Sequence, residues 1–296
     1  MIHSMKSKQT LLFILILLLF YYSTKAQDDV EKETIEYAEP IFNTTLLVIG
    51  QTTETATNGD LIFNIQHRFG AVNSGWYEFF GLDQATTRLG FQYGITDWLS
   101  IGIGRTTLEK TYDGSLKIKI LRQRSGKGKM PLSISYFGNL GINSLKWSDI
   151  DRKNYFSSRM SYVNQLLIAH KFKKVVSLQI MPTLVHYNLV EKDTDDNDVW
   201  SIGAGGVFNI SERISINAEY YYVISNQTAA DYVNSFSIGI DINTGGHVFQ
   251  LYATNAAGII EQHFIGRTNG KWLDGDIHIG FNISRSFTLK KKDYFE

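Results

Sequence analysis

Residues 88–106 read RLGFQYGITDWLSIGIGRT, and this stretch decides the fold. In each half, large apolar side chains alternate with small or polar ones: Leu89, Phe91 and Tyr93, then Leu99, Ile101 and Ile103. A period of two is typical of a β-strand whose two faces meet different surroundings. Residues 94–97 supply turn-forming residue types between the halves. The stretch therefore predicts a β-hairpin with one apolar face and one polar face.

The same hairpin pattern occurs a second time. Residues 93–102 align with residues 208–217: an aromatic residue, a small residue or amide, isoleucine, a hydroxyl, an acid, and then an alternating strand. A hairpin design that is used repeatedly is typical of an up-and-down array, which closes on itself as a barrel.

The N-terminus has the pattern of an export signal. Lys6 and Lys8 precede an unbroken apolar run over residues 11–22, and Ala26 precedes Gln27. This predicts a signal peptide over residues 1–26. A retained anchor is the alternative, although a membrane-spanning helix needs about 20 apolar residues. We therefore expect the mature chain in the outer membrane of a Gram-negative cell.

Composition narrows the function classes. The chain has no cysteine, so disulfides and thiolate metal sites are excluded. Its 29 basic and 29 acidic residues give no net field toward nucleic acid. With 25 glycines, 18 phenylalanines, 16 tyrosines and 3 prolines, the composition suits strands flanked by aromatic girdles.

Alternation along the chain predicts an all-β fold, an antiparallel up-and-down transmembrane β-barrel of about 12 strands. The expected strands are 61–69, the two arms of 88–106, 116–121, 132–142, 159–169, 175–187, 199–208, 214–224, 233–242, 248–254 and 277–287. Turns near Thr96, Lys127, Lys173, Glu212 and Gly245 are short, and the other connections are longer. This rim asymmetry predicts short periplasmic turns, longer outer loops and both termini in the periplasm. The strands of a soluble β-sandwich also alternate between apolar and polar residues. The predicted signal peptide, the strand length and the difference between the two rims favour a membrane barrel.

Four segments follow from this pattern. They are a signal peptide (1–26), a periplasmic lead or lumen segment (27–60), the barrel (61–289) and a charged tail (290–296). Residues 41–50 form either an extra strand, which raises the count toward 14, or a segment tucked into the lumen. If the segment fills the lumen, its deletion is expected to raise conductance.

Strand parity places seven charged side chains inside the barrel: Arg68, Arg88, Lys117, Lys119, Glu219, Asp241 and Asp276. The cations come from the first four strands and the anions from the last four. Opposite charges on opposite walls set a transverse field that orients dipolar solutes in a pore. Alternatively, these charges pair and plug a narrow lumen, because buried charges need partners.

No residue pattern selects a catalytic or metal site. The histidines are scattered without paired ligand spacing, so we expect no metal and no cofactor. A barrel lipid hydrolase or acyltransferase needs a serine, a histidine and an orienting polar group at one rim, and no motif selects such a trio. The acidic residues 193–198 are either a calcium-binding loop or a solvated loop.

Several strings in this order resemble a Bacteroidetes-type outer-membrane β-barrel family of unknown function. They are HRFG (67–70), FGLD (80–83), KTYDG (110–114), LRQ (121–123), HVFQL (247–251) and GFNISR (280–285). The resemblance covers about residues 42–287. It implies a membrane barrel in the outer membrane, and it carries no substrate or catalytic residue.

The sequence therefore favours a non-enzymatic pore, transporter or closed scaffold that contacts outer-membrane lipid. A small solute is the expected cargo of the transport form, and no nucleic acid partner is expected. The alternatives are a lipid hydrolase or acyltransferase, and a docking barrel for a protein partner.

Overall fold

The structure is a computed structural model that describes residues 34–148, 150–151, 153–190, 195–224 and 232–290. The predicted signal peptide lies outside the described residues. Residues 291–296 of the predicted tail and residues 193–194 of the acidic loop also lie outside them.

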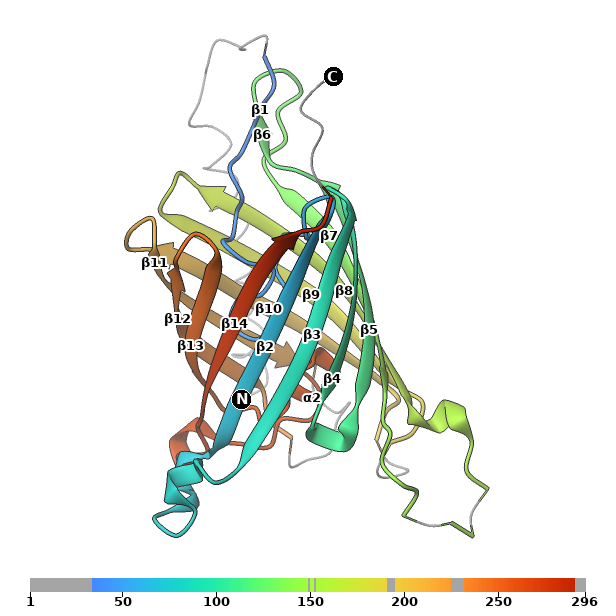
Figure 1. The fold of residues 1–296 in the computed structure, drawn as a ribbon. Helices are drawn as coiled ribbons and strands as arrows, with labels where there is room; N and C mark the ends of the chain where they lie inside the picture. Colours follow the sequence, from blue (N-terminus) through green and yellow to red (C-terminus); the bar gives the residue numbers. More distant parts are fainter. Residues whose placement is uncertain (1–33, 149, 152, 191–194, 225–231, 291–296) are drawn as a thin grey trace, which may run out of the picture.

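Within the described residues, twelve antiparallel strands close into one barrel (Figure 1). They are β2 (Asp60–Ala71), β3 (Ala85–Thr96), β4 (Leu99–Thr106), β5 (Tyr112–Leu121), β7 (Ser133–Ile142), β8 (Met160–Phe172), β9 (Val176–Tyr187), β10 (Asp198–Asn209), β11 (Ile214–Val223), β12 (Ser235–Asn243), β13 (His247–Thr254) and β14 (His278–Thr288). Neighbours in sequence pair in space, and β14 pairs with β2 to complete the circle. The predicted fold class and strand number are confirmed.

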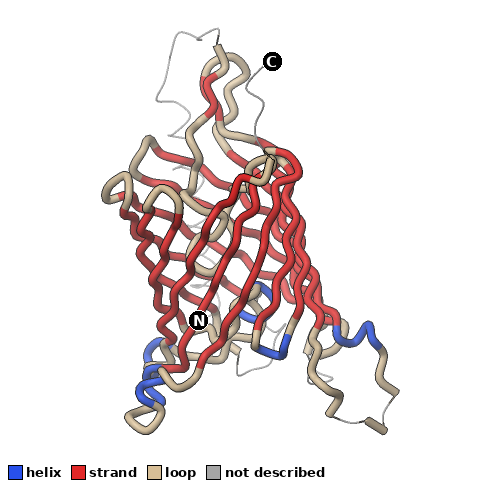
Figure 2. The backbone as a smooth tube through the Cα atoms, in the orientation of Figure 1, coloured by secondary structure: helices blue, strands red, loops and turns tan. Residues whose placement is uncertain are grey.

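The two rims of the barrel differ. At the upper rim in Figure 2, tight turns join β3 to β4, β8 to β9, β10 to β11 and β12 to β13. At the opposite rim the connections carry the short helices η1 (Val72–Ser74), η2 (Phe79–Gly81), η3 (Leu108–Lys110), η4 (Phe156–Arg159), α2 (Glu261–Phe264) and η5 (Trp272–Asp274). We call these the short-turn rim and the long-loop rim. No described helix is long and apolar enough to cross a membrane.

Burial alternates along the strands as the sequence pattern predicts. In β12 the inward residues Ser237 and Asp241 are buried, whereas the outward residues Ile238 and Ile240 are exposed. Ile240 pairs with Ile216 on one side and Leu251 on the other, so aliphatic side chains run across neighbouring strands. An apolar outer surface around a polar interior is the arrangement of a transmembrane barrel.

One strand is longer than the alternation suggested. β5 begins at Tyr112, four residues before the expected start at Leu116. The apolar alternation fails there because Gly114 takes an outward position, and the inward Asp113 is buried. A glycine on the lipid face removes the apolar residue that the pattern needs.

The N-terminal segment enters the barrel from the short-turn rim. β1 (Glu36–Tyr37) pairs with β6 (Arg124–Ser125), which lies in the connection between β5 and β7 (Figure 1). Residues 41–57 then run inside the lumen, where Leu47, Thr53 and Ala56 are fully buried. They add no strand to the barrel. Of the two arrangements open from the sequence, the structure has the lumen segment.

The return from the lumen to β2 requires a close approach to the wall. The Gly59 N–H donates to the Gly94 carbonyl oxygen at 2.8 Å. A Cβ added to Gly94 would lie 2.0 Å from the Thr57 carbonyl oxygen. Only glycine fits at this point of β3, where the chain passes against the wall.

The lipid-facing surface gives a stability prediction. Replacing Ile240 with lysine is expected to lower the folding free energy in bilayers by about 2–4 kcal/mol, because a charge on the lipid face must be desolvated. Leu273, in η5, is 102% exposed and lies outside the barrel strands, so Leu273→Lys is the matched control. Urea titration in lipid vesicles measures both, and equal effects would contradict the lipid-facing assignment.

Candidate functional site

The lumen has a polar wall and an apolar wall. Strands β11–β14 and β2–β5 turn polar side chains inward, including Asn217, Glu219, Asp241, Gln250, Asn282, Gln66 and Lys117. Strands β8–β10 turn mostly apolar side chains inward, including Val163, Leu167, Met181, Val185, Val199 and Val207. Whatever fills this lumen must therefore offer hydrogen-bonding groups on one side and apolar side chains on the other.

Residues 41–57 meet both demands, and we call them the N-terminal plug. Phe42, Leu47, Val48 and Ile49 are buried in the apolar cluster of the lumen. The plug has little regular structure of its own; a single isolated bridge joins Leu46 and Gln51. Its main-chain groups must therefore find partners on the wall.

Side chains of the polar wall supply those partners. One carboxylate oxygen of Glu219 accepts the N–H groups of Ile49 at 2.8 Å and Gly50 at 3.0 Å. Asn217 donates to the Leu47 carbonyl oxygen at 2.6 Å, and Asn282 donates to that of Val48 at 2.8 Å. These contacts replace the secondary-structure bonds that the plug lacks.

Further strands hold the plug with amide and ammonium groups. Gln179 accepts the Thr53 N–H at 3.0 Å and donates to the Gln51 carbonyl oxygen at 2.8 Å. Lys117 donates to the carbonyl oxygens of Thr45 at 3.2 Å and Glu54 at 3.0 Å. The plug is thus bonded to β5, β9, β11 and β14.

A second segment fills the lumen from the long-loop rim. Residues 256–268, which include α2, form this loop plug, and Ile259, Phe264 and Ile265 are buried in it. The fully buried Arg68 side chain donates to the Ala256 carbonyl oxygen at 2.6 Å and also to that of Gly258. Loop carbonyl groups therefore accept hydrogen bonds from one nitrogen, Nη1, of the most deeply buried wall cation.

The two plugs meet inside the barrel. Gln51 of the N-terminal plug donates to the Glu261 carboxylate of the loop plug at 3.0 Å. The space between them, bounded by Arg88 and Phe137 among others, is about 10 Å³. This volume is at the lower limit for a single water molecule, about 10–15 Å³. The two plugs therefore leave little free volume where they meet.

Arg88 pairs with a residue that the sequence analysis missed. Its guanidinium donates to both carboxylate oxygens of Asp113, at 2.9 Å and 2.5 Å, and to Gln66 at 2.8 Å. A planar bidentate pair fixes the arginine within the wall. The signal for Asp113 was its parity with Lys117, hidden because the expected strand began too late.

The structure turns six of the seven predicted charges toward the lumen: Arg68, Arg88, Lys117, Lys119, Glu219 and Asp241. They do not pair across the barrel with one another. Lys119 pairs with Glu54 of the N-terminal plug at 3.0 Å, and Asp241 accepts hydrogen bonds from Asn217 and Gln250. Their partners lie on the plugs, on adjacent strands or, for Asp113 with Arg88, two strands away.

The expected lumen position of Asp276 is wrong. Asp276 lies in the loop between η5 and β14, because β14 begins only at His278. Its carboxylate accepts the Lys271 N–H at 2.9 Å and a hydrogen bond from Asn73 at 2.5 Å. These bonds, the first above all, hold the pKa of Asp276 below its usual value. The residue organises the long-loop rim.

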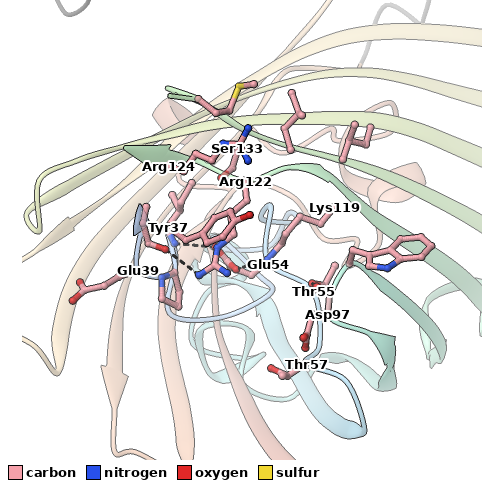
Figure 3. A pocket seen from close by; sticks show the side chains of 17 residues that line it. Tyr37, Glu39, Glu54, Thr55, Thr57, Asp97, Lys119, Arg122, Arg124 and Ser133 are labelled. Atoms are coloured by element: carbon pink, nitrogen blue, oxygen red, sulfur yellow. Dashed lines mark hydrogen bonds and ion pairs between the residues drawn. The ribbon is translucent and has the colours of Figure 1, made fainter. Parts of the chain in front are cut away.

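A stalk of residues 36–40 joins the N-terminal plug to the short-turn rim (Figure 3). The Arg122 guanidinium lies 4.9 Å from the Tyr37 ring centre and donates to the Ala38 carbonyl oxygen at 3.1 Å. Lys171 donates to the Pro40 carbonyl oxygen at 2.8 Å. A cavity of about 710 Å³ lies between the stalk and the wall. The stalk is therefore held at the rim and remains reachable from that side.

The loop plug is held by a charged cluster at the other rim. Glu109, in η3, lies 3.3 Å from Arg267 and 3.5 Å from His263, and it accepts a hydrogen bond from Asn143 at 3.0 Å. The hydrogen bond with His263 is the main cause that lowers the pKa of Glu109, while burial opposes it. We call Glu109, His263 and Arg267 the loop latch.

The family described as "Membrane bound beta barrel domain (DUF5777)" matches residues 42–287. The chain belongs to this family. The match begins inside the N-terminal plug and ends in the last strand, so this membrane-bound barrel family spans both lumen-filling segments.

Solved structures with a similar fold include two porins and an outer membrane channel. The NanC porin is 11% identical, with 77% of this chain and 100% of that chain covered, at a TM-score of 0.48. The KdgM porin is 10% identical, with 77% and 99% covered, at 0.46. An outer membrane channel from Pseudomonas putida F1 is 12% identical, with 79% and 98% covered, at 0.49. No curated protein matches the chain.

In this barrel, the trio that a lipid hydrolase needs is not assembled among the described residues. His263 faces Glu109 through Nε2, and its Nδ1 is buried without a hydrogen-bond partner there. No described serine hydroxyl bonds to a histidine ring. No described group of three histidine, aspartate or glutamate side chains has the geometry of a metal site.

The Glu219 contacts predict how firmly the N-terminal plug is docked. Glu219→Ala leaves the buried N–H groups of Ile49 and Gly50 without an acceptor, at about 1–3 kcal/mol each. Cleavage by chymotrypsin at the buried Phe42, followed by mass spectrometry, is expected to accelerate at least roughly tenfold, since about 1.4 kcal/mol corresponds to a factor of ten. Ser215→Ala is the control, because that inward hydroxyl has no partner among the described residues. Equal rates in both variants would contradict the docking.

The loop latch predicts sensitivity to acid. Because the pKa of Glu109 is lowered in the folded protein, its contribution is complete above the ordinary value of 4.5 and is lost as pH falls through the lowered value. Amide exchange of residues 259–266, corrected for the intrinsic effect of pH, is expected to rise only below about pH 4.5.

Glu109→Gln is expected to remove that acid transition. Asp276→Asn is the control, because this acid lies at the same rim but bonds Asn73 and Lys271 rather than the loop plug. A transition that persists in Glu109→Gln would show that another group holds the loop.

Proposed function

We propose that this protein is an outer-membrane channel for small solutes that is closed at rest by two internal plugs. Supporting it are a membrane-bound barrel family and a lumen whose wall is lined by polar side chains on one side. The short-turn rim faces the periplasm, as in other barrels of this class, and the long-loop rim faces outward.

The hydrogen bonds between wall and N-terminal plug carry the proposal. Glu219, Asn217, Asn282 and Gln179 bond to main-chain groups of a segment that has no regular structure. Water can take the place of each of these partners when the segment leaves. The wall is therefore suited to a water-filled lumen as well as to a filled one.

Both plugs are attached so that they can withdraw without crossing the barrel. The N-terminal plug is continuous with the stalk at the short-turn rim, so a pull on that side draws it out. The loop plug is joined at both ends to the long-loop rim, through β13 and the segment before β14. Opening thus needs movement toward opposite sides of the membrane.

Burial in the apolar cluster keeps the resting state closed. Phe42, Leu47, Val48 and Ile49 are each 3% exposed or less. Full burial of such a side chain contributes about 1.5–3 kcal/mol. We therefore expect rare spontaneous openings and a need for a ligand or a pull to open the lumen.

Two plugs in series give a conductance prediction. Mature protein, a deletion of residues 34–57, a replacement of residues 257–267 by a glycine–serine linker, and the double variant are compared in planar bilayers. Either single change is expected to raise conductance only partly, because the other plug still obstructs the lumen. The double variant is expected to conduct most. A folded double variant, verified by heat-modifiable gel migration, that never conducts would favour the closed scaffold.

The intact lumen is tested with a reversible lock. Glu36 and Ser125 are paired across β1 and β6, and the chain has no other cysteine to interfere. Oxidised Glu36→Cys/Ser125→Cys is expected to lose the openings that the unmodified protein shows, and reductant is expected to restore them. Openings that persist in the oxidised protein would rule out withdrawal of the stalk.

A further inference from the structure

A cavity at the long-loop rim lies directly above the loop plug. It has a volume of about 370 Å³ and is bounded by the loop latch, the connection between β7 and β8, and the ends of β8 and β9. This volume falls within the range of small-molecule sites, about 300–1,000 Å³. Residues of the loop plug, His263 and Arg267, form part of its lining.

Two arginines line the cavity, and each is stacked on an aromatic ring. The Arg159 guanidinium carbon lies 3.8 Å from the Trp147 ring centre, and that of Arg267 lies 4.3 Å from the Tyr187 ring centre. Stacking fixes the plane of a guanidinium group and leaves its N–H edge available for a planar anion. The arrangement is preorganised for a carboxylate.

The charges in the cavity are not balanced. Arg159 donates through Nη1 to the carbonyl oxygens of Asn143 at 2.9 Å and Leu145 at 2.5 Å, which satisfy hydrogen bonds without neutralising the charge. Among the described lining residues Glu109 is the one carboxylate, and it is shared by Arg267 and His263. The described part of the lining therefore has a net positive charge that favours an anion.

Uncharged polar groups complete the lining. Besides Asn143, they are Thr111, Ser148, Asn154, Ser158 and Ser161. Thr111 Oγ1 and His263 Nδ1 are buried and have no hydrogen-bond partner among the described residues. Both atoms are shielded from the cavity, so they are not contacts for a solute. The hydroxyls of Ser148, Ser158 and Ser161 are at least partly exposed and can bond the hydroxyls of a solute.

We propose that this cavity binds a small hydroxylated carboxylate, of the sugar-acid class, through Arg159 and Arg267. The carboxylate binds the two guanidinium groups, the solute hydroxyls bond Ser148, Ser158 and Ser161, and the ring carbons pack on Met160, Leu189 and Val190. The inference rests on the proposed function and names the solute class that the channel admits.

Binding at this position would act on the loop plug. Arg267 holds Glu109 at 3.3 Å in the loop latch. A solute carboxylate on Arg267 competes with Glu109 for the same guanidinium group, so occupancy weakens the attachment of residues 256–268. The solute thereby favours opening of the plug that blocks its own path.

The test is calorimetric titration of the full mature protein in nanodiscs with D-glucuronate and with D-glucose, which lacks the carboxylate. Saturable binding of glucuronate is expected, with glucose at least tenfold weaker. Arg159→Gln and Arg267→Gln are each expected to weaken glucuronate binding at least tenfold. Arg105→Gln is the matched control, because Arg105 lies 5.4 Å from the Tyr112 ring at the same rim outside the cavity. Its binding is expected to be unchanged.

Each other outcome has a defined meaning. Equal affinity for glucose, equal affinity for inorganic phosphate, or unchanged binding in both cavity variants would overturn the sugar-acid assignment. Arg159→Lys keeps the positive charge but lacks the planar guanidinium group that stacks on Trp147, so it should bind glucuronate with intermediate affinity. This variant controls for a folding defect in Arg159→Gln. Glucuronate binding without conductance would contradict the proposed channel function but support the binding site. Conductance without glucuronate binding would support the channel function and contradict the binding site.

Discussion

The rest of the structure depends on the hydrogen bonds between wall side chains and the main chain of the N-terminal plug. A peptide segment without regular structure cannot be buried unless its N–H and C=O groups find partners. Glu219 supplies two acceptor contacts, to Ile49 and Gly50, while Asn217 and Asn282 supply donors. These bonds allow seventeen residues (41–57) to lie inside a barrel to which they add no strand. They also explain why one wall of the lumen is polar.

Charge pairing inside the lumen follows from the same constraint. A buried charge without a partner carries a large desolvation cost, so each lumen charge has a contact close by. Arg88 uses Asp113 on a neighbouring inward position, Arg68 uses carbonyl groups of the loop plug, and Lys119 uses Glu54. A transverse field between opposite walls is replaced by local contacts. Removing a plug would expose these charges to water, where they can act on a solute.

The strands and their faces could be predicted from the sequence because apolar and polar side chains alternate along a strand that has lipid on one face and the lumen on the other. Inward placement of Glu219 and Lys117 followed from parity alone. The partners of those residues could not be predicted, since residues 41–57 and 256–268 have no periodicity that indicates what they contact. Asp113 was missed because Gly114 interrupts the apolar face, and Asp276 was misplaced because parity was extended to residues before the start of β14 at His278. The loop latch joins Glu109 to His263 and Arg267 across more than 150 positions, a proximity that only the closed barrel creates.

The most direct test is amide hydrogen exchange of the mature protein in lipid, resolved for residues 46–54. These residues form no barrel strand, yet the N–H groups of Ile49, Gly50 and Thr53 are bonded to Glu219 and Gln179 inside the lumen. Protection comparable to that of the barrel strands is predicted, falling sharply in the stalk at residues 36–40. Exchange as fast as that of a free peptide would show that the segment does not occupy the lumen, and the account of a lumen filled by the N-terminal plug would be wrong.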